Sequence, residues 1–205
     1  MGLYRDRVLP HLVDRVCGTA ELRRFRVAAT EGLSGRVVEI GFGSGLNVGT
    51  YPAAVTRVEA VEPASVSWRL AGERIAGSPV PIDRVGLEGE SIPLEDGSCD
   101  SALSTFTLCT IPDVERALAE VRRVLRPGGR LHLLEHGLSP DLSVAAWQRR
   151  VEPVQKRLAG GCHLTRDPLA LVAGAGFAIE RSEQRYARGP RPFSWFTTAV
   201  AVRSA

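Results

Sequence analysis

The sequence predicts an α/β protein built on a doubly wound, seven-stranded, mostly parallel sheet with one antiparallel strand. Two features support this prediction. Short β-branched apolar runs alternate with helical segments along the chain, an order typical of parallel α/β sheets. An early strand also runs directly into a glycine-rich turn, as strands do where such sheets bind nucleotides. The 205 residues are expected to form one domain, 1–205, with residues 1–30 as an N-terminal helical cap.

The first half of the chain is expected to supply four strands. Apolar, β-branched runs predict them at residues 36–40, 57–62, 81–86 and 99–106. Residues 4–30 read as one or two helices with arginine on one side, and residues 64–76 as a further helix.

The clearest helix follows the fourth strand. Pro112 is expected to open it, with Asp113 and Glu115 in its first turn. Arginines, the last being Arg126, occupy its final turn, and Pro127-Gly128-Gly129 stops it. Acids at the start and bases at the end stabilise a helix through its dipole.

The second half of the chain continues the alternation of strands and helices and ends in a predicted antiparallel pair of strands. A strand is predicted at 130–135, helices at 142–159 and 168–174, and strands at 177–186 and 195–203. Pro153 should kink or divide the first of these helices. The last two strands are joined by a short turn at 188–192, and short connections join antiparallel strands.

Composition excludes several classes of protein. The formal charge is +3 and the arginines are scattered, so no nucleic-acid partner is implied. No apolar run approaches the ~20 residues of a membrane span, and the first residues lack the apolar core of a signal peptide. The four cysteines show no C-x-x-C spacing, so we expect no metal site, no disulfide framework and a cytoplasmic location. The preference for arginine over lysine fits a GC-rich, bacterial genome.

The glycine-rich turn is the strongest functional signal. The strand ending at Ile40 runs into Gly41-x-Gly43-x-Gly45, and Glu62 ends the next strand, 17 residues after the last of these glycines. Glycines let the backbone approach a ligand closely, and a carboxylate at this offset can accept both hydroxyls of a ribose. Together they predict a nucleoside-bearing cofactor.

The phase of the glycines distinguishes between cofactors. A dinucleotide fingerprint reserves its third position for Gly or Ala, and here that position holds Leu46. The chain has a single lysine, Lys156, far from the loop, so no Walker motif is present. A nicotinamide oxidoreductase is therefore disfavoured, while a non-catalytic nucleoside-binding protein stays open.

Glu39-x-Gly41-x-Gly43-x-Gly45 resembles motif I of class I S-adenosylmethionine (SAM) dependent methyltransferases. The resemblance implies their Rossmann-like fold, SAM as cofactor and S-adenosylhomocysteine as product. It also implies that the three glycines admit the methionine part of SAM and that Glu62 binds its ribose. Glu88-Gly89, in the loop after the third strand, resembles the adenine-binding position of these enzymes. The remaining predicted cofactor-binding residues are Glu39, Asn47 and Thr105.

The acceptor side narrows the family further. Residues 104–109 lack both the Asp/Asn-Pro-Pro-aromatic motif and the Pro-Cys motif of DNA-base methyltransferases. Four segments, 43–52, 107–109, 123–136 and 161–167, resemble the mammalian alkyl thiol S-methyltransferases. Two departures are a hydrophobic anchor in those membrane-bound relatives, which we do not expect here, and an aspartate where this chain has Glu62. The resemblance implies methylation of a small molecule, with an aliphatic thiol as first choice.

A thiol acceptor would need little help from a base, because a thiol with a pKa of ~8.5 is partly ionised at neutral pH. For other acceptors His136 and His163 are the candidate bases, and His136 is the predicted catalytic residue. His132, Cys109 and Trp147 are read as core or pocket-wall residues, and residues 165–167 as a helix cap. The alternatives are C- or O-methylation of a quinone precursor or N-methylation of a lipid headgroup, because such enzymes share motif I and the Arg-Pro-Gly-Gly turn. The oligomeric state stays open.

Overall fold

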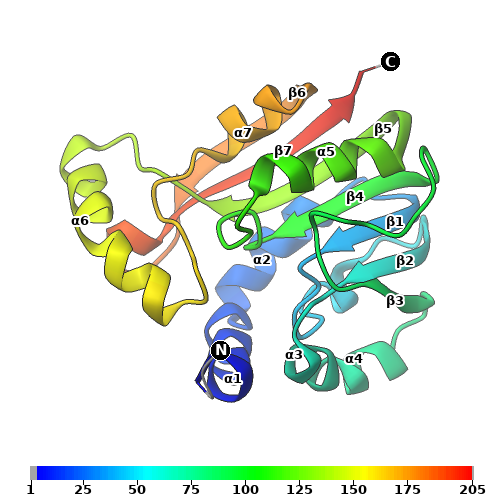
Figure 1. Cartoon of the computed structure of the whole chain (residues 1–205), viewed down its shortest axis with the longest axis horizontal. Coiled ribbons are helices and arrows are strands. Elements are labelled where there is room, and N and C mark those ends of the chain that lie inside the picture. The colour runs from blue at the N-terminus through cyan, green and yellow to red at the C-terminus, as the bar shows by residue number, and fades with distance from the viewer. Residues whose placement is uncertain (1–3, 205) are drawn as a thin grey trace.

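The structure, a computed structural model, describes residues 4–204. A seven-stranded sheet runs through it in the order β3-β2-β1-β4-β5-β7-β6, and helices lie on both faces (Figure 1). The strands are β1 (Gly35–Ile40), β2 (Val55–Val61), β3 (Ile82–Gly86), β4 (Cys99–Thr105), β5 (Leu125–His136), β6 (Phe177–Tyr186) and β7 (Trp195–Arg203). The helices are α1 (Leu9–Cys17), α2 (Ala20–Thr30), α3 (Ser65–Leu70), α4 (Gly72–Ala76), α5 (Val114–Val124), α6 (Leu142–Leu158) and α7 (Pro168–Gly174).

The pairing of the strands confirms the predicted fold class. Strand β1 is parallel to β2 and β4, so that Val38 lies opposite Glu59 on one side and Ala102 on the other. Strand β7 is antiparallel to both β5 and β6, which confirms the reversed strand. The chain needs only a short connection between β6 and β7 because the two strands run in opposite directions.

The central strands are buried on both faces. Val37 and Val38, neighbours on β1, are both 0% exposed, as expected where helices cover both sides of a parallel sheet. Helix α5 packs an apolar stripe, including Leu118 and Val121, into the core that it shares with α7. The core on the opposite face of the sheet contains Ala71, between α3 and α4, together with Phe42. The sheet therefore presents a rigid edge to the loops that follow its strands.

Several predicted boundaries were wrong, most clearly those of α5 and β5. Helix α5 begins at Val114 because Asp113 caps it, accepting from the Arg116 amide at 3.0 Å, so Pro112 precedes the helix. It ends at Val124, before Arg126. Strand β5 then starts at Leu125, which pairs with Cys99, and the Pro-Gly-Gly turn forms an irregularity within the strand.

Two further differences concern the other helices. Residues 64–76 form two helices, α3 and α4, that meet at Ala71 and Gly72; glycine is a poor helix former. Helix α6 continues through Pro153, so the proline does not divide it; the alternative, a kink, stays a prediction. The carbonyl group that the proline leaves without a donor belongs to Arg149, which is exposed, so water can satisfy it.

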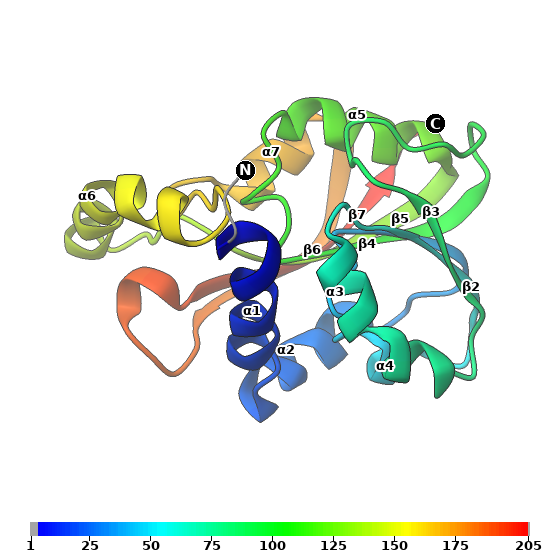
Figure 2. The same ribbon diagram turned by 60° about the horizontal axis from the view of Figure 1, so that its bottom comes forward.

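The carboxyl ends of β1, β2 and β4 point toward one edge of the molecule, the edge near α1 and α6 (Figures 1 and 2). Helix α1 is tied to the glycine loop there: Ser44 donates from Oγ to Asp14 at 2.6 Å, and Arg74 of α4 donates to the same carboxylate at 2.9 Å. Within residues 4–204, no helix has the length and apolar content needed to cross a bilayer.

Candidate active site

The glycine loop after β1 adopts a backbone that only glycine tolerates well. Gly41, Gly43 and Gly45 have φ values of 67°, 61° and 76°, in the left-handed region. A β-carbon on Gly41 would lie 2.1 Å from Thr107 Oγ1, whereas one on Gly43 would meet only the Gly41 carbonyl oxygen, at 3.8 Å. Gly41 is therefore needed for packing, and Gly43 borders open space of the kind that a ligand needs.

Glu62, directly after β2, holds this loop. Its Oε2 accepts from the Gly43 amide at 2.6 Å and its Oε1 from the Ala64 amide at 2.7 Å. Its side chain is buried, and burial raises the pKa of Glu62 although both amides oppose the shift. Each carboxylate oxygen can accept a second hydrogen bond, so the predicted ribose role fits this position.

A buried polar network lies among three of the predicted cofactor-binding residues. Asn47 donates from Nδ2 to Glu39 Oε1 and to Thr105 Oγ1, both at 2.9 Å. Tyr51 donates to Glu39 Oε2 at 2.6 Å. Arg26 donates from one guanidinium nitrogen to Asn47 Oδ1 at 2.9 Å and to Thr105 Oγ1 at 2.8 Å. Burial raises the pKa of Glu39 to about 7.

This network locates Glu39, Asn47 and Thr105 together, and their contact with SAM stays a prediction. Sequence reasoning missed Arg26 and Tyr51 as members. Arg26 lies on α2 and is 5% exposed, and its Nε atom has no partner within residues 4–204. Nothing distinguishes it in the sequence from the chain's other arginines, because its burial depends on how α2 packs.

The predicted adenine position lies in the loop after β3. Glu88 is exposed and Gly89 is buried. A β-carbon on Gly89 would approach Ile111 to 3.3 Å, so the absence of a side chain allows the loop to pack closely. An exposed carboxylate beside a buried backbone fits the predicted binding of adenine, which stays a prediction.

On the acceptor side, Glu135 organises the loop that follows β4. Its Oε1 accepts from Ser104 Oγ at 2.8 Å and from the amides of Thr107 and Leu108 at 2.9 and 3.0 Å. The loop begins with Phe106 at a φ of 53°, which is uncommon for a residue other than glycine. Glu135 is fully buried, and burial raises its pKa.

The segment 161–167 packs against the same loop. The His163 amide donates to the Cys109 carbonyl oxygen at 2.8 Å. Arg166 donates to the carbonyl oxygens of Leu108 and, at 2.8 Å, Ile111. Two parts of the chain that the sequence shows far apart are thereby joined at the carboxyl ends of β4 and β5.

The other end of the segment is anchored to two helices. Thr165 donates from its amide and its hydroxyl to Glu152 of α6, at 2.8 and 2.6 Å. Asp167 caps α7, accepting from the amides of Leu169 and Ala170 at 3.0 and 3.1 Å. The predicted helix cap is confirmed at Asp167.

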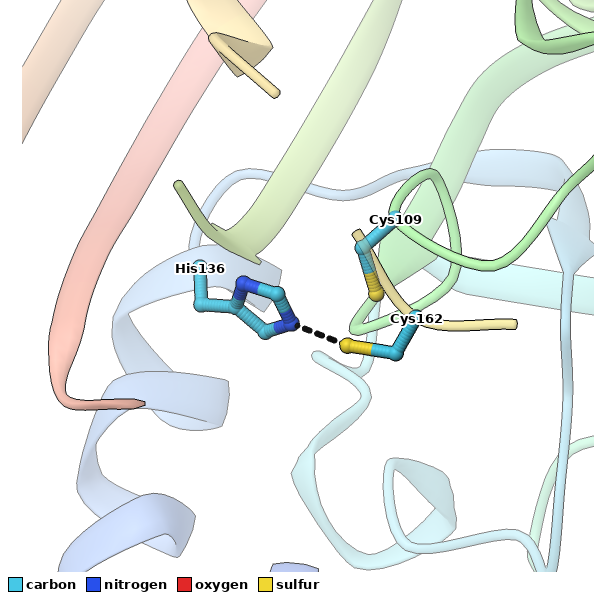
Figure 3. Close-up of side chains that lie close together, drawn as sticks. All are labelled: Cys109, His136 and Cys162. Atoms are coloured by element: carbon cyan, nitrogen blue, oxygen red, sulfur yellow. Dashed lines mark hydrogen bonds between the residues drawn. The ribbon is translucent and has the colours of Figure 1, made fainter. Parts of the chain in front are cut away.

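His136, the predicted catalytic residue, ends β5 and contacts a cysteine. Its Nε2 lies 2.9 Å from Cys162 Sγ (Figure 3). The Cys109 thiol and the His136 imidazole outweigh burial and lower the pKa of Cys162 to about 4. Burial alone would lower the pKa of His136, but the contact with Cys162 outweighs burial and raises it. The ring is therefore engaged with Cys162, and its predicted role as a base stays a prediction.

The remaining candidates have simpler surroundings. His132 is a core residue as predicted, with Nδ1 2.9 Å from the Ala29 carbonyl oxygen. His163 lies 3.6 Å from Glu152, and Cys109 is buried. Trp147 is not a core residue: it is 58% exposed and lines an open apolar hollow of about 380 Å³ with Phe193.

Comparisons with known proteins agree with this geometry. A model of a methyltransferase domain matches residues 38–133. Thiol S-methyltransferase TMT1B of Homo sapiens is 35% identical over 176 residues, covering 83% of this chain and 70% of that protein. Its Rattus norvegicus counterpart is 34% identical over 163 residues, covering 78% and 65%. The chain thus spans about two thirds of the length of these relatives.

Solved structures share the fold. A protein of Bacillus halodurans described as a methyltransferase superposes with a TM-score of 0.73 at 15% identity, covering 89% of this chain and 99% of that one. Geranyl diphosphate methyltransferase, solved in complex with SAM, superposes with a TM-score of 0.67 at 14% identity, covering 99% and 91%.

Proposed function

The chain belongs to the class I SAM-dependent methyltransferases, and from that premise we propose that its small-molecule acceptor is an aliphatic thiol. The observation that carries the proposal is the contact between residues 107–109 and residues 161–167. Both segments resemble the thiol S-methyltransferases, and the His163 amide joins them through the Cys109 carbonyl oxygen. They meet at the carboxyl ends of β4 and β5, where an acceptor would enter.

The cofactor side has residues suited to hold SAM. Gly43 leaves space beside the backbone, Glu62 would accept from the ribose hydroxyls, and Glu88 with Gly89 would bind adenine. When bound, SAM supplies a methyl group that is already activated by its sulfonium. The protein's task is then to position the acceptor and exclude water, because in-line transfer depends mainly on orientation.

The acceptor side suits a nucleophile that ionises without a dedicated base. His136 is engaged with Cys162, and Glu135 is engaged with three donors of the loop after β4. A free thiol has a pKa of ~8.5 and therefore supplies thiolate at neutral pH. A catechol or an amine would need a base more strongly.

A screen with isotopically labelled SAM tests the proposal. Aliphatic thiols of increasing chain length, phenols, a quinone-precursor ring and an ethanolamine headgroup would be offered to the wild-type protein. We expect labelled thioethers from the thiols, and a lower yield from a Glu62→Ala variant at SAM concentrations below saturation. Methylation of a quinone precursor or a lipid amine, with every thiol unchanged, would contradict the thiol proposal and favour the alternative acceptors. Transfer to any acceptor would exclude a non-catalytic nucleoside-binding role.

A further inference from the structure

We propose that Cys109, His136 and Cys162 bind a single Zn²⁺ ion, and that the fourth coordination position of this ion takes the sulfur of the acceptor. The second half of this inference rests on the proposed thiol methyltransferase function. The metal site itself does not, because it is argued from the side chains alone.

The three side chains converge from three separate segments. Cys109 lies in the loop after β4, His136 is the last residue of β5, and Cys162 follows α6. Figure 3 shows both sulfur atoms and the imidazole close together, and their possible ligand atoms all lie within 4.8 Å of one another. Tetrahedral zinc with two Zn–S bonds of ~2.3 Å and a Zn–N bond of ~2.1 Å places its ligand atoms roughly 3.5–3.8 Å apart.

One distance would change when the ion binds. His136 Nε2 and Cys162 Sγ lie 2.9 Å apart, so this contact would open by about 0.6 Å to reach tetrahedral spacing. A rotation of either side chain about its own bonds can supply such a shift. The Nε2 atom would be the coordinating nitrogen, because it is the ring atom in contact with the Cys162 thiol (Figure 3).

The donor set selects a particular kind of metal. Two thiolates and an imidazole are soft or borderline ligands, which favour zinc over magnesium, calcium or manganese. Cys109 and Cys162 are 4% and 6% exposed, and two thiolates would neutralise the charge of a divalent ion in this buried place. The described residues, 4–204, provide no fourth His, Cys, Asp or Glu in the cluster. Three protein ligands with one open position are typical of catalytic zinc sites.

The surrounding hydrogen bonds hold the two cysteines in place before any ion binds. Glu135 fixes the backbone just before Cys109. The His163 amide connects the chain beside Cys162 to the Cys109 carbonyl oxygen. Gln155 of α6 donates to Cys162 Sγ at 3.8 Å. A metal site is strengthened when such outer contacts orient its ligands.

The cluster stands next to the cofactor loop. Thr107, two residues before Cys109, donates from its hydroxyl to the Gly41 carbonyl oxygen at 3.4 Å. An acceptor thiol that binds the ion loses its proton to solvent and is held as a thiolate. In the transfer, a carbon–sulfur bond to this thiolate forms as the methyl–sulfonium bond breaks. The neutral thioether product is a weaker ligand and leaves the ion.

Metal binding by the reduced full chain tests the site without any enzymatic assay. The protein would be stripped of metal under reducing conditions, reloaded with Zn²⁺ and analysed by elemental mass spectrometry. We expect one zinc per chain for the wild type and at least a 100-fold loss of affinity in Cys109→Ala, His136→Ala and Cys162→Ala. Cys99→Ala is the matched control, because Cys99 is equally buried but begins β4 instead of following it; it should keep one zinc. No binding by the reduced wild type, or equal binding by the cluster variants, would overturn the site.

Cobalt provides a second measurement that does not depend on whether an alanine variant folds. Co²⁺ in the wild-type site should show sulfur-to-metal charge-transfer absorption. Cys162→His keeps three ligands, so this variant should retain the ion and lose about half of that absorption, one thiolate of two. An unchanged spectrum in this variant would exclude Cys162 as a ligand and overturn the site.

The same cobalt protein tests the fourth position. Adding an aliphatic thiol should strengthen the charge-transfer absorption, and adding the corresponding alcohol should not. If the thiol leaves the spectrum unchanged although thiols are methylated, the fourth-position assignment is wrong and the proposed function stands. If the thiol binds the ion but no thiol is methylated in the labelled-SAM screen, the proposed function is wrong and the metal site stands.

Discussion

The cofactor side and the acceptor side of this molecule are assembled in different ways. The cofactor side depends on residues close together in the sequence: Gly43 and Glu62 follow consecutive strands and are joined by a direct hydrogen bond. The acceptor side depends on three distant segments, in which Cys109, His136 and Cys162 come together only through the fold. A local motif can therefore be recognised in a single sequence, whereas a site built from distant segments becomes visible only in the structure.

The largest expected effect is a loss of cofactor binding on the cofactor side. Gly43→Val should abolish measurable SAM binding, because the new side chain would enter the open space beside the loop at a φ of 61°, a backbone that strains β-branched residues. Titration calorimetry with S-adenosylhomocysteine measures the loss. Gly49→Val is the matched control, since a β-carbon there meets nothing within 4 Å and the backbone is not left-handed; its affinity should be unchanged. Wild-type affinity in a folded Gly43→Val protein would show that the loop does not contact the cofactor.

On the acceptor side, the largest loss of stability is expected when Glu135 is replaced. Glu135→Ala would leave the hydroxyl of Ser104 and two amides without their acceptor. Each unpaired buried donor costs about 1–3 kcal/mol, so we expect roughly 3 kcal/mol of lost stability and a melting temperature lower by about 6–12 °C. Glu180→Ala, which removes an exposed ion pair with Arg130, should leave the melting temperature nearly unchanged. Equal thermal shifts in the two variants would contradict an organising role for Glu135.

A buried acid adjoining the cofactor loop should make stability depend on pH. Burial raises the pKa of Glu39 from its ordinary 4.5 to about 7, so the folded protein keeps a proton that the unfolded chain releases. This contribution is fully present below about pH 4.5 and is lost as pH rises through about 7. In Glu39→Gln, which can still pair with Asn47 and Tyr51, that loss should disappear. Denaturant unfolding should show the wild type losing about 3 kcal/mol relative to the variant across this range; parallel curves would contradict the shift.

Glu62 connects the loop to the predicted ribose site, and its removal should weaken binding without abolishing the fold. Glu62→Ala removes the acceptor for Gly43 and Ala64 and for the ribose hydroxyls. Hydrogen bonds to charged groups contribute about 1.5–3 kcal/mol each, so affinity should fall at least ~10-fold. Asp83→Ala, an exposed acid on the next strand, should change affinity less than about twofold by calorimetry. Equal affinities would reduce Glu62 to a loop anchor.

The sequence predicted the fold more fully than the site, and the reasons are physical. The order of strands and helices depends on short-range periodicity, so β6 and β7 were predicted with their observed bounds. The start of β5 was missed because Leu125 joins the strand through its pairing with Cys99, which local pattern does not reveal. The buried position of Arg26 and the Cys109–His136–Cys162 cluster were missed for the same reason. The lack of C-x-x-C spacing led us to expect no metal site, yet spacing describes only ligands that are close in sequence.

The smallest expected effect concerns the extent of the acceptor side along α6. Trp147 on α6 is 58% exposed and lines the open hollow with Phe193, and neither residue belongs to the Cys109–His136–Cys162 cluster. Trp147→Ala should therefore change stability by less than about 0.5 kcal/mol, as most substitutions at exposed positions do, and should leave SAM affinity and thiol methylation unchanged. Phe193→Ala, at 42% exposure, is the matched control for the same hollow. A several-fold rise in the acceptor KM in both variants, with unchanged SAM affinity, would show that the acceptor extends into the hollow. The acceptor side would then include this part of α6 as well as the Cys109–His136–Cys162 cluster.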